Sequence, residues 1–466
     1  MEGRRCRDRE PVKGQTGGTP SPEGVSTKLQ RIARLAREAP QRAFLSLAHY
    51  LDMAFLHEAF RRTRKDAAPG VDGQSGADYA THLEENLRGL LDRCKAGRYH
   101  APPGRRAYGP KGDGTTTRPI GVPTFEDKVL QRAVAMGLEA VYEQDFLEWS
   151  YGFRPRRSAH QALQALGQGL LQRGGGWVLE VDIHGFFDTV DHRQLRRSLD
   201  QRVRDGVIRR TLDKWLKAGV LEGTTLSPPA TGTPQGSGVS PLVANLYVHE
   251  VLAKWFAATV KPRLKGRAFL LRYADDAVGV FACEEAARRV LEVLPKRFGK
   301  YGLTRHSQKP RVLRFAPPAT RAAREAGPRG NAPGSFEFLG LTHYWAKSRK
   351  GVWVVKHKTA ASRFGRAVKG LAHWCRVNRH QPVPWQHQQL IGKLRGHEAY
   401  YGLTGNAPAL RRLRYEVARV WQKWLNRRSH RAAMPWERFQ GLLQRYPLPA
   451  PVLDHSVYRH VAKPCT

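Results

Sequence analysis

The stretch LLRYADDAVGVF, residues 270–281, places two adjacent aspartates between two apolar runs. Both runs are rich in residues that favour β-strands, so the pattern predicts a hairpin with Asp275 and Asp276 at its tip. Side-by-side carboxylates repel each other unless a positive group lies against them. A divalent cation with oxygen ligands is one candidate for that group. The alternative is a polar turn that happens to contain two aspartates.

A third acid follows a second predicted strand. Residues 177–183, WVLEVDI, form a short apolar run that ends at Asp182, and Gly185 permits a turn soon afterwards. Asp182 can therefore point into a cleft, although an N-cap for the following helix is an equally good interpretation. Asp275 lies 93 positions further along the chain (275 minus 182), and adjacent central strands would bring the acids together.

The 466-residue chain is strongly basic. It has 79 Lys and Arg against 40 Asp and Glu, a formal net charge of +39. Such a surface predicts a polyanionic partner. Nucleic acid is the first candidate, and an anionic membrane is a distant second. The length is enough for about two to four domains.

Three carboxylates in one cleft of so basic a protein are hard to explain without cations. Two Mg²⁺ ions roughly 3.5–4 Å apart would stabilise both the attacking and the leaving oxygen of a phosphoryl displacement. A nucleotidyl transferase and a nuclease both use this chemistry, so the acids alone leave the two open.

Two further segments favour a polymerase. The turn at residues 110–114, PKGDG, predicts a hairpin, on which Lys111 and Arg118 could clasp a triphosphate. Two solvated basic residues are the alternative interpretation. The loop at residues 232–241, GTPQGSGVSP, exposes its backbone, and Gln235 offers both a donor and an acceptor. A nuclease needs no nucleoside-triphosphate pocket.

The five cysteines are isolated, which excludes a disulfide framework and a zinc site and fits a reducing compartment. They are Cys6, Cys94, Cys283, Cys375 and Cys465. Neither a signal peptide nor a membrane span is evident, so we expect a cytoplasmic protein with no membrane partner.

Composition shifts near residue 346. From there to residue 466 the chain has 24 Lys and Arg against 4 Asp and Glu, a net of +20 (24 minus 4). A helix is predicted over residues 410–428, with an apolar stripe on one face and arginines on the others. A helix of this kind can track a phosphate backbone, or it can belong to a helical bundle with a solvated face. The arginines that would bind RNA are Arg411, Arg412, Arg414 and Arg419.

Several sequence blocks occur in order between about residue 27 and about residue 460. They are TRKDAAPGVDG, RPIGVPTFEDKVLQRAV, WSYGFRPRRSAHQAL, VDIHGFFDTVDH, GTPQGSGVSPLVANLY, RYADD and FEFLGL. With these blocks the chain resembles the bacterial group II intron-encoded proteins, which are reverse transcriptases with maturase activity.

The resemblance implies a role for each candidate site residue. Asp182, Asp275 and Asp276 would hold two Mg²⁺ ions, assisted by the backbone carbonyl of Ile183. Phe338, Leu339 and Gly340 would form the primer grip. The nucleotide-binding residues would be Lys111 and Arg118 on the triphosphate, Phe187 as the gate against a ribose 2′-hydroxyl, Gln235 in the nucleotide and template pocket, and Lys309 as the proton donor to pyrophosphate.

Three positions depart from the family pattern. Thr115 to Thr117 stand where a basic residue is common, and Ala253 replaces a usual Asp. Pro310 stands where Thr usually follows the lysine. None of these departures affects Asp182, Asp275 or Asp276.

The resemblance also implies an α+β fold shaped as a right-hand polymerase, with fingers, a ferredoxin-like palm and an α-helical thumb that doubles as the maturase domain. We expect a disordered basic tail over 1–26, fingers and palm over 27–345, the thumb/maturase domain over 346–430 and a short basic DNA-binding segment over 431–466. The His-Asn-His endonuclease of many relatives is expected to be absent, and with it second-strand cleavage.

The sequence thus predicts a Mg²⁺-dependent RNA-directed DNA polymerase that also binds group II intron RNA and assists splicing and target-primed mobility. Its other partners would be an RNA template with a DNA primer, target DNA and dNTPs, in a bacterial cytoplasmic ribonucleoprotein. Two alternatives remain: a non-catalytic RNA-binding maturase, and a domesticated reverse transcriptase without an intron partner. The retained acids argue against the first.

Overall fold

The computed structural model describes residues 22–110, 117–227, 231–233, 236–305, 311–317, 334–428 and 434–455. The chain forms two compact units that interleave in sequence. Unit 1 comprises Met1–Pro102, Pro123–Asp145 and Gln201–Trp215, and unit 2 comprises Pro103–Val122, Phe146–Asp200 and Leu216–Thr466.

Unit 1 is helical. Its elements are α1 (Pro22–Glu38), η1 (Leu47–Tyr50), α2 (Met53–Arg62), α3 (Gly76–Thr81), α4 (Leu83–Lys95), α5 (Phe125–Tyr142) and most of α9 (Gly206–Lys217). The predicted helix after Thr124 is α5, and the Thr124 side chain caps it by accepting a hydrogen bond from the Asp127 backbone N–H. Leu130, Val134 and Leu138 are buried, and both α1 and α2 pack against α5.

Helix α1 begins within the segment expected to be a disordered tail. It starts at Pro22, so residues 22–26 are helical. A proline is favourable at the first helical position, where its missing N–H needs no partner, and Val25 and Ile32 are buried. These residues therefore belong to the folded part of the chain.

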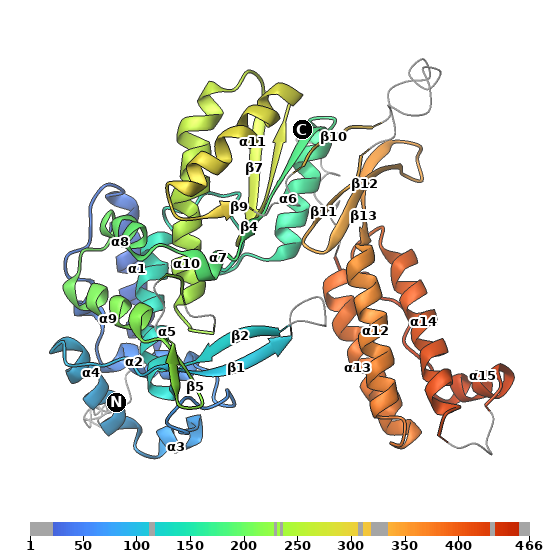
Figure 1. Ribbon diagram of the computed structural model, residues 1–466, viewed down its shortest axis with the longest axis horizontal. Coiled ribbons are helices and arrows are strands. Elements are labelled where there is room, and N and C mark those ends of the chain that lie inside the picture. The colour runs from blue at the N-terminus through green and yellow to red at the C-terminus, as the bar shows by residue number, and fades with distance from the viewer. Residues whose placement is uncertain are drawn as a thin grey trace, which may run out of the picture. The chain divides into compact units, whose positions relative to one another are not determined.

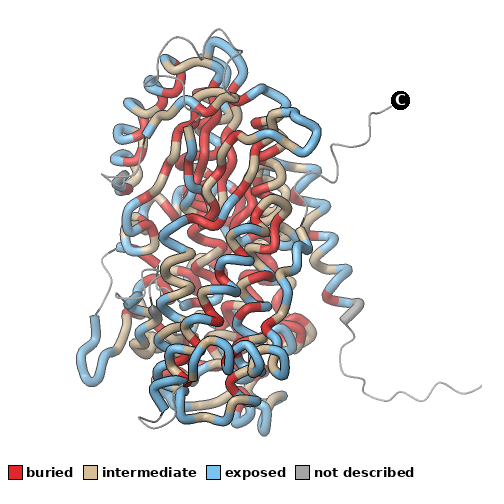
Figure 2. Tube along the Cα trace, turned by 90° about the vertical axis from the view of Figure 1, so that its right-hand side faces the viewer, coloured by how far each residue is buried: buried red, intermediate tan, exposed pale blue. Residues whose placement is uncertain are grey.

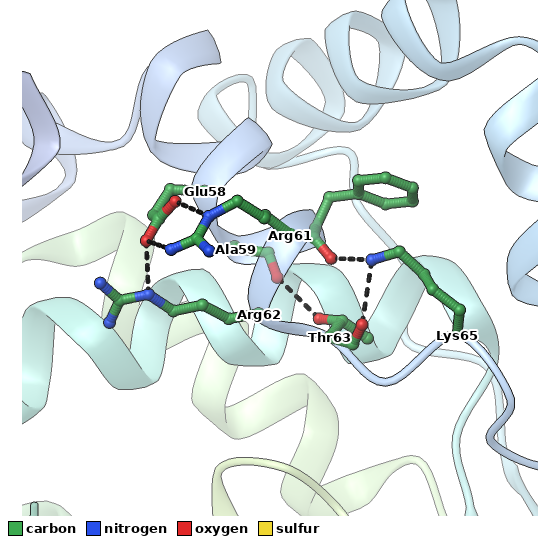
Figure 3. A network of polar contacts seen from close by, with 7 residues as sticks. Glu58, Ala59, Arg61, Arg62, Thr63 and Lys65 are labelled. Carbon is green, nitrogen blue, oxygen red and sulfur yellow. Dashed lines mark hydrogen bonds and ion pairs between the residues drawn. The ribbon is translucent and has the colours of Figure 1, made fainter. Parts of the chain in front are cut away.

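A network of charged side chains lies at the C-terminal end of α2 (Figure 3). The Glu58 carboxylate accepts hydrogen bonds from Arg61 at 2.6 and 2.7 Å and from Arg62 at 2.6 Å. These bonds lower the pKa of Glu58 from 4.5 to about 2, although burial acts in the opposite direction. Beyond the helix, Thr63 donates to the Ala59 carbonyl at 2.8 Å, and Lys65 donates to the Thr63 carbonyl at 2.9 Å.

Unit 2 is organised around a four-stranded antiparallel sheet, here called the palm sheet. It contains β3 (Gly176–Val181), β7 (Ala268–Tyr273), β8 (Asp276–Phe281) and β10 (Val312–Phe315). Their order is β10-β3-β8-β7, which is 4-1-3-2 along the chain and is the order of a ferredoxin-like sheet. Helices α6 (Ala159–Gln172) and α11 (Glu284–Gly299) pack against it (Figure 1).

The core of the palm sheet follows from its apolar strands. Five consecutive residues of β8, from Ala277 to Phe281, are buried, as a central strand covered on both faces requires. Figure 2 shows buried residues gathering along the strands and on the helix faces against them. The α+β fold with a ferredoxin-like palm is therefore confirmed.

Smaller elements surround the palm sheet within unit 2. A second sheet, in the order β2-β1-β5-β6, contains β1 (Gly104–Pro110), β2 (Thr117–Val122), β5 (Val220–Glu222) and β6 (Thr225–Ser227). A short pair joins β4 (Ile183–His184) to β9 (Thr304–Arg305). The helices are α7 (Phe186–Thr189), α8 (His192–Asp200) and α10 (Ser240–Val248), the last continuing as the wider turns of η2 (His249–Lys254) and η3 (Phe256–Val260) and ending in η4 (Lys261–Arg263).

The boundary expected at residue 346 falls inside a strand. A three-stranded antiparallel sheet contains β11 (Phe336–Phe338), β12 (Leu341–Lys347) and β13 (Trp353–Thr359), and the helical region begins only at Ala361. The inner faces of these strands bury Leu341 and Val355 in the core of the palm, so the sheet packs with the palm although basic residues become frequent from Lys347 onward. Composition therefore placed the change about 15 residues before the first helix (361 minus 346).

The helical region contains α12 (Ala361–Val377), α13 (Val383–Tyr401), α14 (Ala407–Leu425) and α15 (Trp436–Arg445). The predicted apolar stripe of α14 is buried at Leu413, Val417 and Trp421. Part of the segment expected to bind DNA packs into this core, since the Phe439 ring meets the Trp421 ring edge-on at 5.7 Å. Among the described residues, no helix has the length and apolar character needed to cross a membrane.

We expect Glu58→Gln to destabilise the protein by about 1–2 kcal/mol at pH 7, because it removes charge-assisted bonds to arginines that are themselves half exposed. The carboxylate has a lowered pKa in the folded state, so its contribution is complete above the unfolded value of 4.5 and is lost as the pH falls towards 2. Chemical denaturation between pH 7 and pH 2.5 measures this. A stability difference between wild type and variant that stays constant over the whole range would contradict it.

Candidate active site

The predicted aspartate hairpin is present. Strands β7 and β8 pair with Tyr273 opposite Asp276, which leaves Ala274 and Asp275 as a two-residue turn. Ala274 has a φ of +56°, a value that hairpin turns of this length require and that glycine usually supplies. An alanine in this conformation is strained by about 1–2 kcal/mol, so the surroundings must hold the turn in place.

The side chain of Arg272 holds the turn through hydrogen bonds. It is fully buried, donates to the Ala274 carbonyl at 3.0 Å and donates to the Ser150 hydroxyl. Burial lowers the pKa of Arg272 to about 9, helped by the positive charge of Arg154 and opposed by Asp275. The guanidinium is still protonated at neutral pH. Arg272 was not among the predicted site residues, although a charged residue inside an apolar strand is a visible signal.

The segment before α6 lies along the outer side of β7. Its backbone exchanges two hydrogen bonds with Arg272, one from the Arg272 N–H to the Trp149 carbonyl and one from the Tyr151 N–H to the Arg272 carbonyl, both 2.9 Å. Gly152 then reaches the turn itself. A Cβ atom on Gly152 would lie 2.1 Å from the Ala274 nitrogen, so only glycine fits.

The pairing of β3 with β8 brings Asp182 beside the hairpin. Val181 lies opposite Ala277, so the next residue of one strand and the preceding residue of the other, Asp182 and Asp276, are neighbours. Both line a cavity of about 520 Å³. Asp182 is half-buried and Asp276 is exposed, whereas Asp275 is half-buried in the adjacent turn and is not among the described residues of the cavity wall.

The cavity wall contains two of the three aspartates predicted to bind metal. No group of three or more His, Cys, Asp or Glu side chains within the described ranges is placed to hold a metal ion. Ile183 is buried in the β4–β9 pair directly after Asp182. Mg²⁺ commonly takes one or two carboxylates and completes its shell with water and substrate phosphate oxygens. Two carboxylates open to a cavity fit that donor set.

The predicted primer-grip residues line the same cavity. Phe338 pairs with Leu341, so Leu339 and Gly340 form the turn between β11 and β12. Their φ values are +51° and +74°, which is the pattern of a type I′ hairpin turn. The structure thus places Phe338, Leu339 and Gly340 across one cavity from Asp182 and Asp276.

The helical region holds this second turn by its backbone. The Tyr400 hydroxyl of α13 donates to the Leu339 carbonyl at 3.0 Å, and the Ala360 N–H donates to the Gly340 carbonyl at 3.0 Å. A Cβ atom on Gly340 would lie 2.9 Å from the Tyr401 hydroxyl, so the turn and α13 are in close contact.

Three arginines in the cavity wall were not predicted. Arg363 and Arg366 come from the first turns of α12, and Arg311 precedes β10. Arg311 also pairs with Glu180 at 3.3 Å, while burial raises the pKa of that glutamate. Cations that face carboxylates across an open cavity are suited to phosphates held between them. For Arg363 and Arg366 the sequence signal was the basic composition after residue 346, which did not single out these two positions.

The elements expected to bind the nucleotide are also neighbours. The Thr233 N–H donates to the Phe187 carbonyl at 2.7 Å, and a Cβ atom on Gly236 would lie 2.7 Å from the Gly121 carbonyl of β2. The GTPQG loop therefore touches both α7 and the strand that carries Arg118, which is exposed. Phe187 is half-buried, and its ring meets Phe153 edge-on at 6.4 Å.

The family model for reverse transcriptases, "Reverse transcriptase (RNA-dependent DNA polymerase)", matches residues 109–343, which are 235 of the 466 residues. The chain belongs to the reverse transcriptase family. Membership implies use of a divalent metal ion. The matched segment contains every element that carries the three aspartates and the predicted primer grip.

Curated relatives include intron-encoded proteins. The chain is 35% identical to "Protein YkfC" of Escherichia coli (strain K12) over 223 residues, which cover 47% of this chain and 56% of the relative. It is 35% identical to "Group II intron-encoded protein LtrA" of Lactococcus lactis subsp. cremoris over 226 residues, which cover 48% of this chain and 37% of the relative. It is 33% identical to "Nuclear intron maturase 2, mitochondrial" of Arabidopsis thaliana over 91 residues, which cover 20% of this chain and 12% of the relative. The chain thus matches about half or less of these relatives' lengths, and the resemblance to the group II intron-encoded reverse transcriptases is confirmed.

Three predicted nucleotide-binding residues of this reverse transcriptase lie outside the described residues. They are Lys111, Gln235 and Lys309. Of the positions that depart from the family pattern, Ala253 is fully buried in η2, so a small apolar residue there fills a packed site.

The four arginines expected to bind RNA are all exposed on α14, namely Arg411, Arg412, Arg414 and Arg419. Three of them also make contacts within the chain. Arg412 lies over the Phe364 ring at 5.2 Å, Arg414 donates to the Leu448 carbonyl at 3.2 Å, and Arg419 lies 3.9 Å from Glu416. Their RNA-binding role remains a prediction.

Gly152→Ala should lower kcat for nucleotide incorporation by about 10- to 100-fold, because the added methyl must displace the Ala274 backbone and the acids that follow it. Gly299→Ala is the matched control, since a Cβ atom there meets nothing within 4 Å. Steady-state primer extension and thermal unfolding of both variants measure the effect. Full activity of Gly152→Ala would show that the turn tolerates displacement and that its close packing does not position the acids.

Proposed function

We propose that the chain is an RNA-directed DNA polymerase that extends a DNA primer on an RNA template with dNTPs. One observation supports this above the others: a single cavity joins Asp182 and Asp276 of the palm sheet to the Phe338–Gly340 turn and to Arg363 and Arg366 of α12. Carboxylates, a backbone turn and arginines on opposing walls suit a primer end and a phosphate chain held between them.

The residues of the chain have separable tasks in this proposal. Asp182, Asp275 and Asp276, with the carbonyl of Ile183, would hold two Mg²⁺ ions. Bound there, the ions would favour deprotonation of the primer 3′-hydroxyl and offset the charge of the triphosphate and of the departing pyrophosphate. The Phe338–Gly340 turn orients the primer end, because its backbone is fixed by Tyr400 and Ala360.

Nucleotide selection would use the fingers and α7. Arg118 would grip the triphosphate through its planar fork, with Lys111 as a second positive charge. Phe187 would exclude a ribose 2′-hydroxyl, and its backbone is held by the Gly232–Thr233 loop, since the Thr233 N–H donates to the Phe187 carbonyl. Gln235 would contact the nucleotide and template, and Lys309 would protonate the leaving pyrophosphate.

We further propose that this polymerase binds group II intron RNA and assists its splicing and its target-primed insertion into DNA. The names of the relatives and the basic face of α14 support this part. The segment after residue 430 would help to bind target DNA, and the complex would work in the bacterial cytoplasm. A non-catalytic maturase is the weaker candidate, because a scaffold gains nothing from two neighbouring carboxylates that line an open cavity.

Replacing either cavity acid with its amide should abolish primer extension while leaving the fold intact. Asp182→Asn and Asp276→Asn keep the side-chain shape and remove the charge that would bind Mg²⁺. Glu292→Gln is the matched control, because this glutamate is exposed on α11 and is absent from the cavity wall. Extension of a DNA primer on an RNA template is measured against Mg²⁺ concentration for all three. Wild-type rates in either aspartate variant would refute the polymerase proposal.

Phe187→Ala should weaken the discrimination between dNTPs and rNTPs by about tenfold or more, because a steric gate loses its ring. Phe187→Tyr retains the ring and should keep the discrimination. The measurement is kcat/KM for a dNTP and for the matching rNTP on one primer–template. An unchanged ratio in Phe187→Ala would remove Phe187 from the gate.

A further inference from the structure

A second cavity lies at the opposite end of the palm sheet from the aspartates. It encloses about 550 Å³ and is lined by residues at the far ends of the strands, among them Trp177 of β3 and Phe281 of β8. Strand β3 runs from Gly176 to Val181, so its length separates this cavity from Asp182 by roughly 17 Å. The two cavities share no lining residue among those described.

Three arginines surround this cavity, and no Asp or Glu is among its described lining residues. Arg173, Arg267 and Arg314 are all exposed. Arg173 lies over the Phe269 ring at 4.5 Å and donates to the Gly169 carbonyl at 3.2 Å. The side chains of Arg267 and Arg314 have no hydrogen-bond or ion-pair partner in the described part of the chain.

Other arginines of the palm have ion-pair partners within the chain. Arg288 and Arg289 of α11 pair with Glu284 and Glu285 one turn earlier, at 2.5 and 2.8 Å. Such pairing neutralises the local charge, whereas three guanidinium groups around one cavity repel one another. An anion between them would relieve this repulsion and accept the donors of the two unpaired side chains.

Three consecutive glycines form the part of the cavity wall that is here called the floor. Gly174, Gly175 and Gly176 have φ values of +65°, +94° and +151°. A Cβ atom would lie 2.2 Å from the Phe315 carbonyl at Gly175 and 2.5 Å from the Phe281 carbonyl at Gly176, so close strand packing explains the glycines. Their consequence is an open floor between the arginines, next to the half-buried ring of Trp177.

We propose that this cavity, the distal arginine pocket, binds the phosphodiester backbone of a nucleic acid strand outside the primer–template channel. The pocket consists of Arg173, Arg267, Arg314, Trp177 and the glycine floor. Arginine forks match phosphate oxygens in geometry and charge, and an indole face beside them offers a base or a ribose a stacking surface. The net charge of +39 makes a polyanion the partner that the protein attracts. The inference does not depend on polymerase activity, because it concerns a separate pocket.

The test compares two double variants of the full chain, each of which removes two positive charges. Arg267→Gln/Arg314→Gln removes the two unpaired arginines of the distal arginine pocket, and Arg288→Gln/Arg289→Gln removes arginines that are already paired. The probe is a single strand of about 20 nucleotides that carries 4-thiothymidine or 4-thiouridine. It is added after the primer–template channel has been saturated with an unlabelled DNA-primed RNA template. Binding is measured over a salt series, and photo-crosslinked peptides are mapped by mass spectrometry.

We expect the wild type to crosslink within residues 172–177 or at the β7 entry near Arg267. The pocket variant should lose this crosslink, and the slope of log K against log salt should fall by about 1.4, since each lost single-strand phosphate contact is worth about 0.7. The control variant should keep both. An RNA probe and a DNA probe of the same sequence decide which strand the pocket holds.

Two results would overturn the proposal. One is the absence of a crosslink in these segments with either probe. The other is a salt slope for the pocket variant equal to that of the control variant. Arg267→Lys/Arg314→Lys guards against misfolding, because it keeps the charge and should keep the slope. Primer extension run in parallel separates this inference from the polymerase proposal: the pocket variant should extend a short template at the wild-type rate, and an inactive wild type that still crosslinks would refute only the polymerase.

Discussion

The antiparallel pairing of β3 with β8 is the constraint on which the site depends. Its register places Val181 opposite Ala277, and this alone makes Asp182 and Asp276 neighbours. A shift by one residue would turn each side chain to the other face of the sheet and would separate the acids. The register is protected because β8 is buried from Ala277 to Phe281, so any other alignment would expose part of the core. The stability of the palm core and the geometry of the acids are therefore set by the same apolar residues.

Backbone strain is concentrated around this pairing. Four non-glycine residues of the described chain have a positive φ, and three of them, Phe153, Ala274 and Leu339, lie in or against the elements of the site. Each strained turn has its own restraint: Arg272 and Gly152 hold the Ala274 turn, and Tyr400 holds the Leu339 turn. Strain of this kind persists only where the surroundings determine the conformation. The Leu339–Gly340 turn in the cavity wall and the Ala274–Asp275 turn next to Asp276 are therefore both supported by other segments, which suits a site that must align two reacting groups.

Local patterns in the sequence predicted the parts of this site that depend on local physics. Two apolar runs of strand-favouring residues identified the Asp275–Asp276 hairpin, a strand end identified Asp182, and a helical stripe identified α14. Contacts between distant segments were not visible. Arg272 acquires its role only because residues 149–152 lie along β7, and Arg363 lies at the cavity because the Ala360 N–H, just before α12, donates to the Gly340 carbonyl. The boundary expected at residue 346 falls inside β12, because charge content does not report the pairing of this strand with β11 and β13.

The pairing of individual charges indicates better than the total charge where this reverse transcriptase can bind an anion. A net charge of +39 predicts a polyanionic partner without indicating where it binds, and many of the 79 basic residues are already satisfied within the chain. Arg311 faces Glu180, and Arg288 faces Glu284, so each would lose an existing ion pair on binding a phosphate. Arg267 and Arg314 would lose none, because they have no such partner among the described residues. An unpaired arginine therefore binds an anion without the free-energy cost of breaking an ion pair. The palm sheet carries acids at one end and such unpaired arginines at the other.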